Sequence, residues 1–166
     1  MVEIAIVAPL LLVLVLTAMN VGIYVSDMLN AGTASRQAAR LAALLGGGKH
    51  VTPTPQTSAY DAQIVQAVQA SAGSMPYASV TEIDIYQPST NSDGSYSPPS
   101  DPADEYNGDG SARSKQTFPL TSRSQSLPGE TPIGVRVVWR FRPPTGLGFP
   151  SLTANQYTVF RALAVP

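Results

Sequence analysis

The first 45 residues form one nearly continuous apolar segment, whereas the rest of the chain alternates short apolar runs with polar stretches. No Asp, Glu, Lys, Arg or His occurs from Ile4 to Ser26. This run is longer than the ~20 apolar residues that a helix needs to cross a bilayer. It also lacks the positively charged start, the short apolar core and the small-residue cleavage site of a secretory signal. The pattern therefore predicts a membrane-spanning helix that is retained.

The helix is expected to continue well beyond the uncharged run. Good helix formers extend from Asp27 to Leu45, and three glycines starting at Gly46 then end the pattern. A helix of roughly 40 residues is about 60 Å long at 1.5 Å per residue, about twice the hydrocarbon thickness of a bilayer. Half of it must project from the membrane. Apolar residues at steps of three and four from Ala31 onwards predict that this half packs on a folded head.

Small or short polar residues recur at every fourth position through both halves of this helix. Such a row lets helix backbones approach closely in lipid, where ordinary hydrophobic attraction does not drive association. The alternative is that alanine simply favours helices and that the spacing is a coincidence. The row comprises Ala18, Gly22, Ser26, Asn30, Ala34, Ala38 and Ala42. We expect Ala18, Gly22 and Ser26 to act in helix assembly, together with Pro9, whose missing donor is tolerated near a helix start.

Glu3 is the exception in the apolar N-terminal segment. A carboxylate at the edge of a hydrophobic span is costly unless it is paired or lies at the interface. One interpretation places Glu3 in the headgroup layer. The other predicts that Glu3 meets the N-terminal amine of a neighbouring copy, so that both charges are neutralised when the helices bundle.

Beyond the helix, the sequence predicts a small polar head of mixed α+β class. A second helix is expected over 58–72, with an apolar face formed by Ile64, Val65, Ala67, Val68 and Ala72 and with Asp61 near its start. Alternating residues predict strands over 79–86, 135–142 and 156–165, the last two paired antiparallel. The expected fold is a long N-terminal hydrophobic helix packed through its C-terminal half on a small antiparallel sheet with one short helix. The chain then divides into a transmembrane or filament-core half (1–26), an exposed half of the helix (27–46) and the head (47–166).

A long segment of the head, residues 87–131, is rich in Ser, Pro, Gly, Asp and Asn. Such a composition does not bury enough apolar area to form a core of its own. We expect an ordered but irregular surface loop here, since the segment is too long for a passive connection.

Charge is distributed unevenly along the head. Residues 50–112 hold eight acidic residues and no Lys or Arg, whereas 113–166 hold seven basic residues and one acidic residue, within a net charge of −1. The two parts should attract each other, either within one head or between neighbouring subunits. No aromatic residues interleave with Arg136, Arg140 and Arg142 as a stacking platform, so a nucleic-acid partner is disfavoured.

Residues that enzymes require are scarce. The chain has no cysteine, His50 is its only histidine, and no phosphate-binding or nucleophile motif occurs. We therefore predict no catalytic residue and no obligatory cofactor. One candidate cation site remains, because Glu105, Asn107 and Asp109 precede a glycine with roughly the spacing of the first ligands of a calcium loop. The closing carboxylate of such a loop is missing, and a solvated acidic turn is the alternative interpretation.

The opening MVEIAIVAPLLLVLVLTAMNVGIY resembles the mature N-terminus of TadE-like pilins, the tight-adherence branch of type IV-like pilins, most closely from Val2 to about Leu16. The C-terminal segment VRVVWRFRPPTGLGFPSLTANQYTVFRALAVP is similar to the closing hairpin of that family. The resemblance implies a prepilin that is cleaved by a prepilin peptidase and handled by the pilus assembly machinery. The subunit would lie in the cytoplasmic membrane before assembly and in an extracellular pilus afterwards.

Two functions follow from this resemblance. The first is a structural subunit that polymerises with itself and with other pilins through its hydrophobic helix, for surface adhesion. The second is a minor pilin or pseudopilin that primes or caps the fibre and binds a surface through its acidic loop.

Overall fold

The computed structural model describes residues 2–45, 57–98, 102–119, 122–123, 131–145 and 150–161, apart from the side chains of 2–5 and 57–58. The elements in chain order are α1 (Val2–Leu45), α2 (Thr57–Ala72), β1 (Ala78–Tyr86), β2 (Ala103–Asn107), β3 (Ala112–Gln116), β4 (Pro132–Phe141) and β5 (Leu152–Arg161). This arrangement confirms the predicted α+β class, with a long N-terminal helix, one short helix and an antiparallel sheet.

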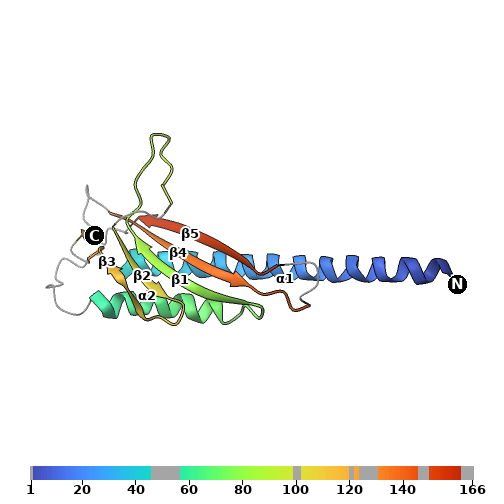
Figure 1. Ribbon diagram of the computed structural model, residues 1–166. Helices are drawn as coiled ribbons and strands as arrows, with labels where there is room; N and C mark the ends of the chain where they lie inside the picture. The colour runs from blue at the N-terminus through green and yellow to red at the C-terminus, as the bar shows by residue number, and fades with distance from the viewer. Residues whose placement is uncertain are drawn as a thin grey trace.

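Helix α1 is the longest element of the protein. It contains 44 residues, which corresponds to about 66 Å at the rise of an α-helix. Its C-terminal half lies along the head, and its N-terminal half extends far beyond it (Figure 1). The described part of α1 ends at Leu45, and the glycines from Gly46, which were predicted to end the helix, lie outside the described residues.

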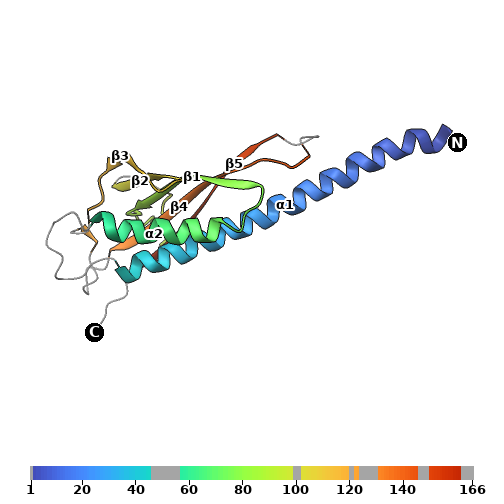
Figure 2. The same ribbon diagram turned by 90° about the horizontal axis from the view of Figure 1, so that it is seen from below.

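All five strands form one antiparallel sheet in the order β3-β2-β1-β4-β5. Both helices lie on the same face of this sheet (Figure 2). Helix α1 contacts α2, β4 and β5, while α2 also contacts β1. The head is therefore a two-layer structure of helices on a sheet.

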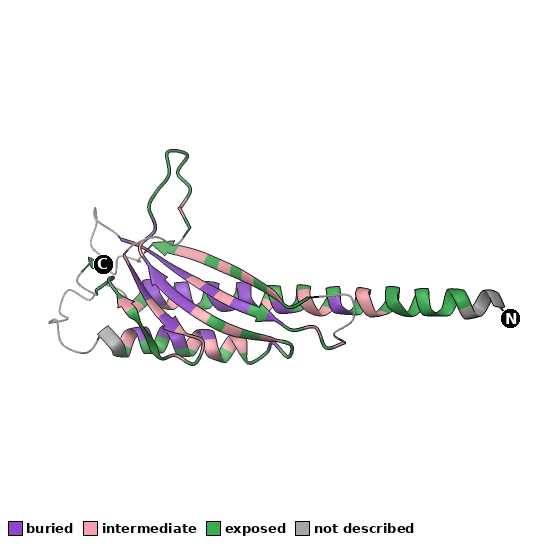
Figure 3. Cartoon of the chain, in the orientation of Figure 1, coloured by how far each residue is buried: buried purple, intermediate pink, exposed green. Residues whose placement is uncertain are grey.

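The core lies between the helices and the sheet (Figure 3). The alternation predicted for 135–142 is confirmed, since Val135, Val137, Trp139 and Phe141 are fully buried. The facing surface of α1 consists of small residues, among them Ala31, Ala34, Ala38 and Ala42, all buried. Because these side chains are short, α1 can lie close to the large side chains of β4.

The expectation of an irregular loop over 87–131 is wrong for two segments, because β2 and β3 lie within it. Strand β2 pairs with β1, with Ile83 opposite Tyr106 and Ile85 opposite Asp104, and β3 pairs with β2. The sheet therefore has five strands rather than the three expected. Backbone hydrogen bonding along the free edge of β1 orders this segment, although its composition is poor in core-forming residues.

Two turns in this region have the same geometry. In both Asn91–Ser95 and Asn107–Ser111, the backbone N–H of Asn donates to the backbone carbonyl of Ser at 2.8 Å. The backbone N–H of the same Ser donates to Oδ1 of the Asp between them at 2.9 Å. Gly94 and Gly110 have φ values of 82° and 86°, a left-handed conformation that favours glycine. The first turn closes a hairpin that stands away from the body of the head (Figure 1).

The last strand differs in its bounds from the expected 156–165. Strand β5 begins at Leu152 and pairs along its whole length with β4, which confirms the predicted antiparallel pairing. Residues 162–166 lie outside the described residues.

Candidate assembly surface on the N-terminal helix

The projecting half of α1 exposes large apolar side chains on all sides. Ile6 is 71% exposed, Leu10 is 67% exposed and Leu14 is 62% exposed. Among the described residues, α1 is the one helix long and apolar enough to cross a membrane. In water this surface would be strongly unfavourable, so it must be covered by lipid or protein.

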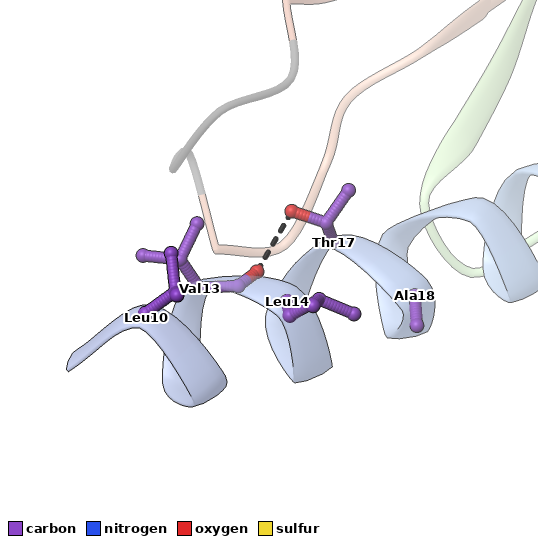
Figure 4. Close-up of a pocket in the computed structure, with 5 residues that line it drawn as sticks. All are labelled: Leu10, Val13, Leu14, Thr17 and Ala18. Atoms are coloured by element: carbon purple, nitrogen blue, oxygen red, sulfur yellow. Dashed lines mark hydrogen bonds between the residues drawn. The ribbon is translucent and has the colours of Figure 1, made fainter. Parts of the chain in front are cut away.

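One stripe of this surface is formed by Leu10, Val13, Leu14, Thr17 and Ala18 (Figure 4). Its only hydroxyl belongs to Thr17, whose Oγ1 donates to the carbonyl of Val13 at 2.8 Å. The polar group is therefore satisfied within the helix itself, as an apolar environment requires. The stripe has no other side-chain polar atom to offer a partner, so it suits an apolar neighbour.

The row of small residues divides between two environments. Ala18, Gly22 and Ser26 are exposed, and a Cβ added to Gly22 would meet nothing within 4 Å. Ala34, Ala38 and Ala42 are instead buried under the head of the same subunit. Between them, Asn30 makes a long contact of 3.5 Å from its Nδ2 to the carbonyl of Ser74. The part of the row that remains open to another helix is thus the Ala18 to Ser26 part.

Pro9 lies inside α1, which continues through it, as expected from its early position. Glu3 also lies in α1, but its side chain is outside the described residues, as is Met1. The predicted pairing of Glu3 with a neighbouring N-terminal amine stays a prediction.

The first fully buried residue of α1 is Asn20. This residue is fully buried, and its Nδ2 donates to Oγ1 of Thr145 at 2.8 Å, in the connection between β4 and β5. One turn further on, the ring of Tyr24 packs against those of Trp139 and Phe141, each at 5.4 Å between centroids. The sequence did not predict that full burial by the head begins at Asn20. A single amide side chain within a hydrophobic run does not indicate which distant segment will cover it.

The opposite charges of the head pair within the subunit. Arg136 binds both Asp84 and Glu82, the latter at 2.7 Å, and Arg113 binds Glu82 at 2.6 Å. Burial raises the pKa of Asp84 to about 6, against the lowering effect of Arg136. The sequence left open whether the acidic and basic parts attract each other within one head or between subunits. These ion pairs form within one head.

A second ion cluster is fully buried and joins three distant segments. The Arg123 guanidinium lies 2.6 Å from Asp61 of α2 and 2.8 Å from Asp104 of β2. The Tyr106 hydroxyl donates to Asp61 at 3.0 Å, and Arg123 stacks over Phe118 and donates to its carbonyl at 2.8 Å. Burial raises the pKa of Asp104 to about 6 and the pKa of Tyr106 above its ordinary range. This cluster fastens the segment after β3 onto the core.

The residues proposed as calcium ligands lie at the end of β2 and in the turn that follows. Oδ1 of Asp109 accepts from the amide and hydroxyl of Ser111, Asn107 donates to the same hydroxyl at 2.9 Å, and Glu105 lies 3.5 Å from Lys115. The bonds from Ser111 lower the pKa of Asp109. In the part of the chain that the structure describes, no three His, Cys, Asp or Glu side chains gather to hold a metal. Calcium binding stays a prediction, and a calcium titration of thermal stability tests it.

Comparison with known proteins gives one match. The chain matches no curated protein and no solved structure. The model of the family described as TadE-like protein matches residues 1–40, a range that includes α1 from Val2 to Arg40. This match covers the exposed apolar surface and the small-residue row together, and it confirms the resemblance of the N-terminal helix to TadE-like proteins.

Proposed function

We propose that this chain is a structural subunit of a Tad-type pilus filament, which polymerises through the projecting half of α1 for surface adhesion. The observation that carries the proposal is that about half of α1 leaves the head with its apolar side chains exposed on all sides. A membrane anchor alone needs such a surface, but it needs no row of small residues. The match of residues 1–40 to TadE-like proteins supports the same role.

In this role, the membrane covers the projecting helix before assembly and neighbouring copies cover it afterwards. Head-to-tail contacts with a helical rotation give open filaments rather than closed rings. Close approach of helices at Ala18, Gly22 and Ser26 gives the packing contacts that replace lipid. The role is structural and requires no catalytic residue.

The alternative is a minor pilin that primes or caps the fibre and binds a surface through acidic residues. Four of the head's carboxylates are already paired with arginines inside the head, those of Asp61, Glu82, Asp84 and Asp104. The exposed carboxylates of Asp93 and Asp109 remain for an external partner in this alternative role. Electron microscopy of sheared fibres with mass spectrometry of their main component separates the two, because only the structural role requires this chain to be abundant.

The assembly surface is tested by Gly22→Leu. The added side chain enters open space in the isolated subunit, so folding and membrane insertion should be unchanged. Filaments should be lost, because the helices can no longer approach at this position. Gly22→Ala is the matched control, since alanine at the same position keeps a small residue in the row and lets the helices approach. Normal filaments from Gly22→Leu would refute the role of this surface.

Glu3→Gln tests the predicted charge pairing. We expect normal insertion but impaired assembly, since the neutral amide does not neutralise the amine of a neighbour. Pro9 and the rest of α1 are unchanged in this variant. Normal yields of fibres from it would leave Glu3 as a headgroup-layer residue.

A further inference from the structure

The end of the head nearest to the projecting half of α1 is formed by the end of β4 and the start of β5 (Figure 1). Its position along the helix is set by two contacts: Asn20 with Thr145, and Tyr24 with Phe141. Tyr77 lies at the same end, where its carbonyl accepts from the amide of Arg142 at 2.8 Å.

The length of α1 places this end at the surface of the bilayer. The helix from Val2 to Met19, before its first fully buried residue, is about 27 Å long at 1.5 Å per residue, close to the ~30 Å of the hydrocarbon core. The step from Asn20 to Tyr24 adds about 6 Å, and the headgroup layer on each side of the core is about 5 to 7 Å thick. The contact at Asn20 therefore falls at the edge of the hydrocarbon core, and the contact at Tyr24 falls within the headgroup layer.

The side chains exposed at this depth include two arginines and a tyrosine. Arg140 and Arg142 are exposed, and Tyr77 is 40% exposed. Among the described residues, neither arginine has a carboxylate partner, and Arg140 donates only to the Ser151 hydroxyl at 3.3 Å. Arg136, further along the same strand, is by contrast occupied by Asp84 and Glu82. The acidic residue of α1 at this end, Asp27, is fully buried.

The geometry points to a lipid-docking surface formed by Arg140, Arg142 and Tyr77, which binds the phosphates of anionic phospholipids in the membrane that α1 spans. Guanidinium groups bind phosphate through paired hydrogen bonds, and exposed tyrosines favour the membrane interface. The surface would fix the depth of α1 and the tilt of the head while the subunit waits for assembly. This inference rests on the proposed insertion of α1 in a membrane.

The size of the effect follows from two arginines near an anionic surface. Each basic residue at such a surface shifts binding by about fivefold, so the pair should shift the balance between docked and undocked heads by about 30-fold. The attraction is screened over a Debye length of ~8 Å at physiological salt. Arg36 and Arg40 are also exposed, but they lie about 18 to 24 Å further along α1 than Tyr24 and serve as matched controls.

The test uses the full chain reconstituted into vesicles of phosphatidylcholine, alone or in equal mixture with phosphatidylglycerol. The chain has no cysteine, so Thr153→Cys provides a unique labelling site at an exposed position opposite Arg140 in the β4–β5 register. A dye at this site is quenched by a phospholipid that carries a spin label on its headgroup. Resistance to alkaline carbonate extraction reports separately whether α1 is inserted.

We expect phosphatidylglycerol to increase the quenching in the otherwise native chain and in the Arg36→Gln/Arg40→Gln variant. The increase should disappear in Arg140→Gln/Arg142→Gln and at high salt, with extraction resistance unchanged in all variants. Equal quenching in both lipids, or equal losses in both double variants, would overturn the lipid-docking surface. If Arg140→Gln/Arg142→Gln assembles poorly and the quenching in the native chain does not depend on the lipid, these arginines belong to a contact between subunits instead. Loss of extraction resistance in the native chain would refute the proposed insertion itself.

Discussion

Replacement of Arg123 by methionine should destabilise the head more than the loss of any exposed charge. Arg123 is 2% exposed and binds Asp61 and Asp104, which are equally buried, and it also donates to the carbonyl of Phe118. Methionine keeps much of the side-chain volume but removes the charge and all four donated bonds. Two carboxylates are then left buried without their counter-ion.

The expected loss follows from this geometry. Removal of one partner from a buried ion pair costs about 3 to 5 kcal/mol, because the remaining charge is neither solvated nor paired. An exposed pair contributes about 0 to 1 kcal/mol. With a urea slope of about 2 kcal/mol/M, a loss of about 4 kcal/mol lowers the unfolding midpoint by about 2 M.

The measurement is urea unfolding of the full chain in detergent micelles, followed by tryptophan fluorescence. Trp139 of β4 is the only tryptophan. It is fully buried against Tyr24 of α1, so its emission reports the native core. Arg113→Met is the control, because the Arg113 side chain, which pairs with Glu82, is 40% exposed. A variant in which Arg123→Met is combined with Asp61→Asn and Asp104→Asn should recover part of the loss. A midpoint for Arg123→Met equal to that of Arg113→Met would refute the reasoning.

Two further predictions concern the sheet. Gly134→Ala should cost about 1 to 3 kcal/mol in the same unfolding assay, because the new Cβ would lie 2.3 Å from Cζ of Tyr86, whereas Gly22→Ala should leave stability unchanged. Stability should also fall as the pH rises from about 4 to about 6. Burial raises the pKa of Asp84 from 3.8 to about 6, so the native state binds a proton that the unfolded state has already lost. The stabilisation from this group is complete below pH ~4 and is lost as the pH rises through 6. Burial raises the pKa of Asp104 to about 6 as well, so this group contributes to the same slope. Asp84→Asn should therefore reduce the slope, and an unchanged slope would contradict the assignment.

The helix α1 and the strands β1 and β4 were predictable from the sequence. A continuous apolar run, glycines at its end and strict alternation around Trp139 are local patterns, and each of them has one favourable backbone conformation. The apolar face of α2 followed in the same way, with Ile64, Val65 and Val68 buried as expected. The separation of acidic and basic residues also predicted that the two parts of the head attract each other, although it did not predict which residues form ion pairs.

Strands β2 and β3 and the Arg123 cluster were decided by the tertiary structure. The segment from 103 to 116 has few apolar residues, and it becomes a pair of strands because β1 offers a free edge of backbone donors and acceptors. Nothing around Arg123 in the sequence indicates burial. Its burial depends on Asp61 and Asp104, which lie 62 and 19 residues away.

The assembly surface divides in the same way. The sequence by itself determined that α1 is long, apolar and lined with small residues, because these properties belong to a single helix. Only the tertiary structure decided that Ala34, Ala38 and Ala42 are covered by the subunit's own head, while Ala18, Gly22 and Ser26 stay open. The reason is that coverage depends on where the β4–β5 connection meets α1, which the contact between Asn20 and Thr145 fixes across 125 residues of chain.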